Sequence, residues 1–140
     1  MYTKILVAIE NSAADQAVLQ HIERLARLTG AGLLLVHVAD GFAARHFNDL
    51  DLRESEEMRE DRAYLQQLCE DMSGKGMVCA ARLAMGDPAT ELVRVAAEEG
   101  VDLIAMSTHG HRFLQDLLRG STADRVRHGV SIPVLMVRAK

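Results

Sequence analysis

Five short apolar runs, separated by segments with helical spacing, constrain the fold of this chain more than any other feature. The runs cover residues 4–9, 33–38, 77–84, 102–107 and 132–137. Apolar runs of this length predict strands that are buried on both faces, as in parallel sheets. Because helical segments alternate with these runs over short links, the sequence predicts an α/β fold. We expect a doubly wound, five-stranded parallel sheet with helices on both faces.

The helical segments carry recognisable start and stop signals. Ser12 and Asp15 resemble a capping box with the shorter acid, and Gly30 follows the last turn of that first helix. Asp87 is placed to cap a later helix in which Pro88 takes the first position. The apolar face of this later helix is predicted at Leu92, Val93, Ala96 and Ala97. No linker or repeat interrupts the chain, so we expect one domain over residues 1–140.

The composition limits the classes of partner and the compartment. The net charge is −4, aromatic residues make up 4% and Trp is absent, which argues against a nucleic-acid or membrane surface. Cys69 and Cys79 match neither a CxxC nor a zinc pattern, so we expect reduced thiols and no metal site. The first apolar run breaks at Glu10, too early for a signal peptide or a membrane span. The sequence therefore predicts a cytoplasmic protein.

Polar residues follow three of the predicted strands and are candidates for a ligand site. Glu10 follows the first run, Asp40 the second, and Ser107 ends the fourth. Ligands of open doubly wound sheets bind beyond the carboxyl ends of the strands, where the strand order reverses. If that reversal falls between the first and fourth strands, the segments at Glu10 and Ser107 form the walls of the crevice.

The stretch MSTHGHRFLQDLLRGST, residues 106–122, allows two interpretations. Gly120, Ser121 and Thr122 supply a glycine, two hydroxyls and a predicted helix start, which together favour an anion-binding loop. Alternatively, Gly120 ends one helix and Ser121 caps the next, without any ligand. The spacing matches neither GxGxxG nor GxxxxGK[ST], so spacing alone favours the capping interpretation.

Several segments together resemble the universal stress protein family. They are KILVAIENS, GDPATELVRVA, GVDLIAMSTHG and LLRGSTADRVRHGVSIPVLMVR, and the resemblance covers essentially the whole chain. The family pattern Gly-x-x-Gly, nine residues, then Gly-[Ser/Thr] corresponds here to Ser107, Gly110, Gly120 and Ser121. The resemblance implies the strand order 3-2-1-4-5, a Rossmann-like arrangement with the switch point between strands one and four. It also implies binding of ATP or another adenine nucleotide, which many members of the family share.

The same resemblance implies a set of site residues. By position they are Ala8, Ile9 and Glu10 beside the nucleoside, Val38 at adenine, Met106 and Ser107 at the ribose and α-phosphate, and Gly110, Gly120, Ser121 and Thr122 around the phosphates. Two positions depart from the family pattern, since Glu10 replaces an Asp and Ser107 replaces a Gly. If position 107 needs a positive φ, Ser adds about 1–3 kcal/mol of strain. If its φ is negative, Ser costs little and its hydroxyl is available to a ribose or phosphate.

We therefore predict a regulatory stress-response module that binds ATP or AMP, with or without Mg²⁺, and acts as a homodimer. The last run, from Ile132 to Val137, is apolar yet lies at the sheet edge, where it invites pairing with a second copy. Efficient catalysis is not expected and no catalytic residue is assigned. No phosphate-loop lysine is evident and Glu10 is the one acid placed at the site, so slow ATP hydrolysis stays open. The alternative is a nucleotide-free dimeric scaffold of the same fold.

Overall fold

Five parallel strands form the centre of the molecule. We describe it from a computed structural model, over residues 1–40, 51–109 and 122–139. The strands are β1 (Lys4–Ala8), β2 (Gly32–Asp40), β3 (Cys79–Gly86), β4 (Leu103–His109) and β5 (Val134–Ala139). They pair in the order β3-β2-β1-β4-β5, and every pair is parallel. The predicted fold class and strand order are confirmed.

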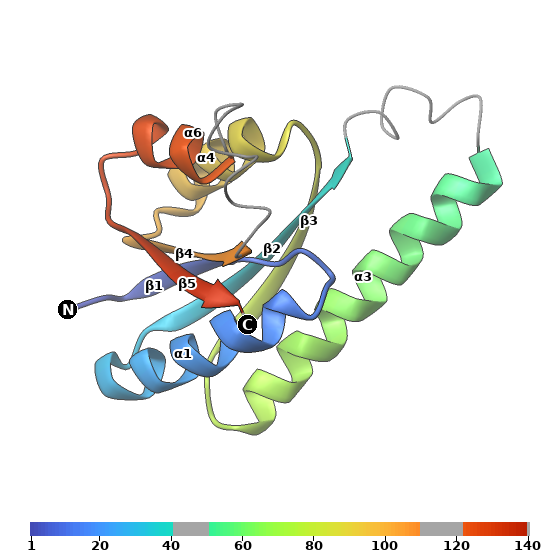
Figure 1. Ribbon diagram of the computed structural model, residues 1–140. Coiled ribbons are helices and arrows are strands. Elements are labelled where there is room, and N and C mark those ends of the chain that lie inside the picture. Colours follow the sequence, from blue (N-terminus) through green and yellow to red (C-terminus); the bar gives the residue numbers. More distant parts are fainter. Residues whose placement is uncertain (41–50, 110–121, 140) are drawn as a thin grey trace.

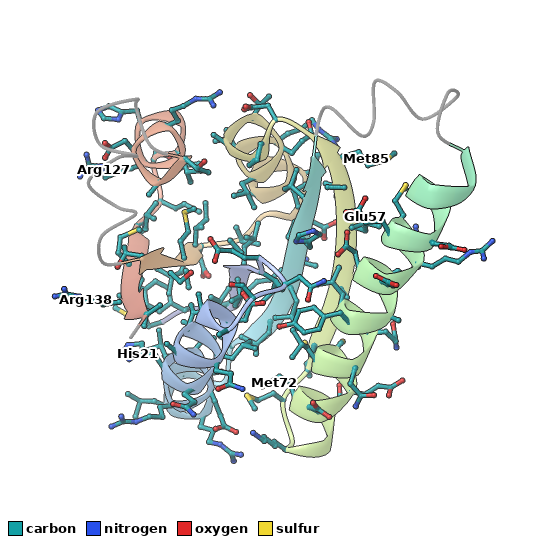
Figure 2. All side chains as sticks on the ribbon, turned by 45° about the vertical axis from the view of Figure 1, so that its right-hand side comes forward. His21, Glu57, Met72, Met85, Arg127 and Arg138 are labelled. Carbon is teal, nitrogen blue, oxygen red and sulfur yellow. The ribbon has the colours of Figure 1, made fainter. Side chains whose placement is uncertain are left out.

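Helices cover both faces of this sheet (Figure 1). The helices α1 (Ala14–Thr29) and α3 (Asp51–Gly74) lie on one face, and α4 (Pro88–Glu99) and α6 (Thr122–Gly129) lie on the other. Ile5 and Val7 of β1 pack into the core cluster beneath α1 and α3, whereas Leu6 packs beneath α4 and α6. Figure 2 shows Met72 of α3 in the space between α1 and α3. This burial on two faces holds for β1, β2 and β4 and explains their continuous apolar runs. The same prediction is wrong for β3 and β5, which lie at the sheet edges and consist mostly of half-buried and exposed residues.

The predicted helix ends are largely confirmed. Asp87 is the N-cap of α4, where its carboxylate accepts a hydrogen bond from the backbone N–H of Thr90 (2.9 Å), and Pro88 takes the first helical position. Gly30 and Gly100 end α1 and α4 in the left-handed conformation, with φ of 75° and 63°. Among the described residues, no helix combines the length and apolar content needed to cross a membrane.

The start of α1 differs from the predicted capping box. Its N-cap is Ala13, and the hydroxyl of Ser12 accepts a hydrogen bond from the N–H of Ala14 (3.3 Å) instead of that of Asp15. The reciprocal half of the box is present, because the Asp15 carboxylate accepts from the N–H of Ser12 (3.1 Å). The Asp15 carboxylate also accepts hydrogen bonds from the N–H groups of Glu10 and Asn11, which a capping box does not require.

The buried face of α4 is rotated relative to the prediction. It consists of Ala89, Leu92, Val95 and Ala96. Ala97 is exposed and Val93 is half-buried, so these two residues were assigned to the wrong face. A face that starts from Ala89 continues at positions three, six and seven residues later, which turns Ala97 toward solvent.

The strands β3 and β5 both begin and end two residues later than the predicted runs. β3 pairs with β2 as far as Asp40↔Gly86, and β5 pairs with β4 as far as His109↔Ala139. The extra residues near the carboxyl edge include the exposed side chains of Met85 and Arg138. Backbone pairing continues there after the apolar pattern has stopped, so hydropathy alone places these strand ends too early.

Candidate functional site

A cavity of about 280 Å³ opens at the carboxyl ends of β1, β2 and β4. The chain proceeds from β1 through β2 to β3 on one side of the sheet, and from β4 to β5 on the other. The strand order therefore reverses between β1 and β4, directly at the cavity. Connections leave neighbouring strands toward opposite faces at such a point, and the space between them is where doubly wound sheets bind ligands.

Seven of the ten predicted site residues line this cavity. They are Ala8, Ile9, Glu10, Val38, Met106, Ser107 and Thr122, contributed by β1 and the residues after it, β2, β4 and the first turn of α6. The other three, Gly110, Gly120 and Ser121, lie outside the described residues. The two walls expected at Glu10 and Ser107 are thus brought together.

Sequence reasoning missed a second group of lining residues. They are Val36, His37, Pro88, Leu92, Thr108, Ala123 and Met136. One of them carried a usable signal, because Val36 lies two residues before Val38 on the same strand face. Met136 enters through its pairing with Met106 in the register of β4 and β5, which neither sequence alone indicates. Pro88, Leu92 and Ala123 enter through the packing of α4 and α6 over the sheet, which no local pattern indicates.

The cavity lies on the face of the sheet that α4 and α6 cover. Ala8, Val38 and Met106 belong to or pack against the apolar cluster beneath these two helices. Ile9 packs into the cluster on the opposite face, beneath α1 and α3. Side chains alternate along a strand, so residues such as Ile9 line the cavity mainly with their backbone.

Ser107 also turns its side chain away from the cavity. It follows Met106 in β4 and pairs with Val137, which packs against the cluster on the α1 and α3 face. Among the described residues, Asn11 is the single non-glycine residue with a positive φ, so Ser107 carries no left-handed strain. Its Oγ atom is buried and has no hydrogen-bond partner within the described part of the chain. A serine therefore fits the position of the family glycine without intruding on the cavity.

Glu10 forms an exposed wall of the cavity. Its Oε2 accepts a hydrogen bond from the hydroxyl of Ser12 (3.2 Å), and its backbone N–H donates to the Asp15 carboxylate (2.8 Å). A carboxylate held at the mouth of a cavity is an acceptor for ligand hydroxyl groups.

His37 lies at the boundary between the cavity and α3. Its Nδ1 donates to the carbonyl oxygen of Ile9 (2.8 Å), and its Nε2 lies 3.4 Å from Oδ2 of Asp61 on α3. The ring thereby ties the end of β2 to the residue that follows β1. The hydrogen bond to Ile9 holds the ring at this corner of the cavity, and the Asp61 carboxylate adds an ion pair when the ring is protonated.

An ion pair joins α6 to α4 at the rim of the cavity. Arg125 of α6 donates two hydrogen bonds to the Asp87 carboxylate (3.0 and 2.7 Å), next to Pro88 in the cavity wall. The Arg125 guanidinium and the hydrogen bonds from Thr90 hold the pKa of the Asp87 carboxyl well below its usual range. A lowered pKa keeps the Asp87 carboxyl ionised at neutral pH, as the ion pair with Arg125 requires.

The chemistry of the described lining is apolar at the centre and hydrogen-bonding at the edge. Val36, Leu92, Met106 and Met136 supply the apolar surface, while Glu10 and the hydroxyls of the threonines supply polar groups. None of the lining residues that the structure describes is Lys or Arg. Within the same residues, no group of three or more His, Cys, Asp or Glu side chains could hold a metal ion. A lining of this kind suits a small organic ligand that combines apolar surface with hydrogen-bonding groups.

Comparison with known proteins identifies the family. The model of the Universal stress protein family matches residues 1–138. The chain belongs to this family. The universal stress protein MJ0577 of Methanocaldococcus jannaschii is 28% identical, over 100% of this chain and 97% of that protein. The universal stress protein YxiE of Bacillus subtilis is 30% identical, over 99% of this chain and all of that protein.

Solved universal stress proteins share the architecture. The structure of MJ0577 matches with a TM-score of 0.75 at 28% identity and covers 100% of this chain and 98% of that one. A universal stress protein solved in complex with cAMP matches with a TM-score of 0.74 at 19% identity, over 99% and 98% of the two chains. One from Archaeoglobus fulgidus, solved in complex with dAMP, matches with a TM-score of 0.68 at 24% identity, over 97% and 98%. The last two likenesses establish the fold.

Proposed function

We propose that this universal stress protein binds an adenine nucleotide in the cavity between β1 and β4 and acts as a regulatory module in the cytoplasm. One observation carries the proposal, namely that seven residues expected at a nucleotide site converge on one cavity at the point where the strand order reverses. Two proteins of the same fold were solved with cAMP and dAMP, which supports an adenine nucleotide as the ligand class.

The backbone of Val38 is suited to the adenine base. The carbonyl of Val36 accepts a hydrogen bond from the N–H of Ile9 (2.8 Å), so it faces β1. The backbone groups of successive residues in a strand point to opposite neighbours. Val38, two residues after Val36, therefore also points its N–H and C=O toward the β1 side. β1 has already ended at that level, at Ala8. A donor and an acceptor beside the apolar surface of Met106 match the edge and the face of a purine.

The other predicted residues take their roles around this base. Ala8, Ile9 and Glu10 lie beside the nucleoside in this proposal, and the Glu10 carboxylate accepts a ribose hydroxyl. Met106 and Ser107 flank the ribose and α-phosphate, and Ser107 contributes its backbone because its side chain points to the α1 face. Gly110, Gly120, Ser121 and Thr122 would surround the phosphates. The described lining has no Lys or Arg, so in this proposal the positive charge beside the phosphates comes from Mg²⁺ bound to them.

We further propose a homodimer in which β5 pairs with β5 of a second copy. β5 is an edge strand of the sheet, and its Met136 is 37% exposed.

Regulation rather than efficient catalysis is the proposed role, because phosphoryl transfer needs cationic charge and a held metal at the site.

The experiment that tests nucleotide binding begins with freshly purified protein. The protein is denatured, the released small molecules are separated by chromatography, and ATP, AMP and cAMP are titrated into ligand-free protein by calorimetry. We expect an adenine nucleotide in the released fraction or saturable binding of at least one of the three. No released nucleotide, together with no binding at millimolar ligand, would reject the proposal in favour of a nucleotide-free dimeric scaffold.

A matched pair of variants locates the site. Ala8→Leu adds a branched side chain to the cavity floor and should abolish nucleotide binding. Ala97→Leu makes the same change at an exposed position of α4 and should leave binding unchanged. Calorimetry on both variants, with circular dichroism to confirm folding, distinguishes the cavity from a surface site. Normal binding by folded Ala8→Leu would place the nucleotide elsewhere.

A further inference from the structure

The loop that carries Glu10 is held by a buried carboxylate. Asp15 is 1% exposed, and its Oδ1 accepts the N–H of Glu10 (2.8 Å) while its Oδ2 accepts those of Asn11 (2.9 Å) and Ser12 (3.1 Å). Asn11 adopts a left-handed conformation with φ of 65°. Consecutive N–H groups that converge in this way form an anion-binding concavity. Here the chain fills it with its own side chain.

The helix α3 completes this arrangement from the other side. The hydroxyl of Tyr64 donates to Oδ2 of Asp15 (2.7 Å). Burial, and then the Asp15 carboxylate, raise the pKa of Tyr64 above its usual value, so the hydroxyl stays protonated and keeps donating. One turn earlier on α3, Asp61 accepts a hydrogen bond from the side-chain amide of Asn11 (2.9 Å). Two side chains of α3 therefore hold this loop, one through the side chain of Asn11 and the other through the Asp15 carboxylate that binds the loop amides.

Asp61 of α3 also reaches β2. Oδ2 of Asp61 lies 3.4 Å from Nε2 of His37, whose other ring nitrogen donates to the carbonyl of Ile9. Ile9, Glu10 and His37 all line the cavity. Asp61 thus contacts both the loop after β1 and the end of β2, two of the segments that line the cavity. A displacement of α3 changes the contacts of both.

We propose that Asp15, Asp61 and Tyr64 are positioning residues of the nucleotide site. They fix the loop that carries Glu10, and they couple occupancy of the cavity on one face of the sheet to α3 on the other. This inference rests on the proposed nucleotide binding. Coupling of this kind is reciprocal, so a ligand in the cavity changes the surroundings of Tyr64, and loss of the α3 contacts changes the affinity for the ligand.

The chain provides an internal control for a spectroscopic test. Tyr2 and Tyr64 are its only tyrosines, and it has no Trp. Tyr2 precedes β1 and packs against the same core cluster at the opposite end of the sheet. Tyrosine labelled with ¹³C at Cζ gives one signal per residue, and the Tyr2→Phe variant assigns them. On addition of ATP or AMP, we expect the Tyr64 signal to shift with occupancy while the Tyr2 signal stays in place.

Variants of α3 test the same coupling by affinity. Tyr64→Phe removes the hydroxyl and should weaken nucleotide binding roughly two- to thirtyfold, the range seen for residues that act through a network. Tyr2→Phe makes the same change outside the network and should bind as the wild type does. Asp61→Asn keeps an acceptor for Asn11 and should bind nearly normally, whereas Asp61→Ala loses both contacts and should weaken binding.

The outcomes separate this inference from the proposal on which it depends. Wild-type protein that binds no adenine nucleotide overturns both. Wild-type protein that binds, with a static Tyr64 signal and normal affinity in Tyr64→Phe, overturns the positioning role and leaves the nucleotide site intact. If Tyr64→Phe fails to fold, the signal of Tyr64 in the wild-type protein decides the matter alone, because a static signal during saturation rejects the coupling.

Discussion

Ser107 replaces a glycine of the family pattern, and β4 accommodates its side chain. The side chain points to the face that α1 covers, so the substitution leaves the cavity on the other face open. Its remaining cost is the hydroxyl itself, which is buried and finds no partner among the described residues. A buried polar group without a hydrogen bond lowers the stability of the folded state.

Ser107→Ala should therefore stabilise the protein. Removing a hydroxyl that has no partner among residues 1–40, 51–109 and 122–139 leaves an apolar group of similar shape, and we expect the free energy of unfolding to rise by about 1 kcal/mol. Urea denaturation of the ligand-free protein measures it. Thr108→Val, which removes a neighbouring hydroxyl that faces the cavity, serves as the comparison and should not give this gain. A loss of stability in Ser107→Ala would mean that the hydroxyl has a partner after all.

Cys79 should react slowly with alkylating reagents. Burial, and then the neighbouring Cys69, raise the pKa of the Cys79 thiol to about 12. The thiolate is the reacting form, so a raised pKa lowers the rate at neutral pH, and the rate should keep rising with pH beyond pH 9. At pH 8 we expect labelling of the folded protein to be at least roughly a hundredfold slower than in urea, where the pKa returns to its ordinary value. Mass spectrometry of the Cys79 peptide after iodoacetamide treatment checks this rate.

At the scale of elements, α4 and α6 pack against each other and together line one side of the cavity. Arg125 joins the two helices at the rim, and Gly129 at the end of α6 allows their close approach. A Cβ atom at Gly129 would lie 2.8 Å from Cγ2 of Val93 on α4. Valine is stiff at χ1, so it cannot easily turn aside. This contact also explains why Val93 is half-buried although it lies outside the face that α4 turns to the sheet.

Gly129→Ala should force α4 and α6 apart. Overpacking of this kind destabilises a protein by about 1–3 kcal/mol. Val93→Ala removes the obstructing methyl groups, so the double variant should recover most of the loss caused by Gly129→Ala. A double-mutant cycle with urea denaturation measures the coupling between the two positions. Additive effects of the two substitutions would show that the helices do not meet at this point.

The element scale also shows what a sequence can and cannot indicate. Asp87 and Pro88 start α4 through contacts within one turn, so a local pattern predicted them. The hydrogen bond from Tyr64 to Asp15 joins residues about fifty positions apart, as does the one from Asn11 to Asp61. No pattern near either partner indicates these contacts. Met136 enters the cavity through the register of β4 and β5, which depends on the paired strands and not on either sequence alone.

For the whole molecule, the alternation of apolar runs and helices was enough to predict the sheet. The central strands β1, β2 and β4 are buried on two faces, whereas the edge strands β3 and β5 consist mostly of half-buried and exposed residues. The resemblance to the family supplied the strand order, and the order located the cavity. The assembly stays a prediction. In β5, the carbonyl of Pro133 accepts from the N–H of Ile104, so alternate residues from 133 onward face β4. Met136 therefore points its N–H to the free edge.

Met136→Pro should turn the dimer into a monomer. Proline removes an N–H that faces the free edge and keeps the hydrogen bonds between β4 and β5, so the fold should survive. Met136→Ala retains this N–H and should remain a dimer. Light scattering coupled to gel filtration gives the mass of both variants and of the wild type. A monomeric wild type, or a dimeric Met136→Pro, would show that β5 does not form the interface.

The carboxylate of Asp15 has a consequence for the whole binding process. A loop whose amides are free must be ordered when its anion arrives, and that lost conformational freedom weakens the observed affinity. Here the anion is a covalent part of the chain, so the loop is ordered when the protein folds. A ligand that enters the cavity meets a loop that is already ordered. The loss of conformational entropy of this segment therefore lowers the free energy of unfolding and does not lower the affinity for the ligand.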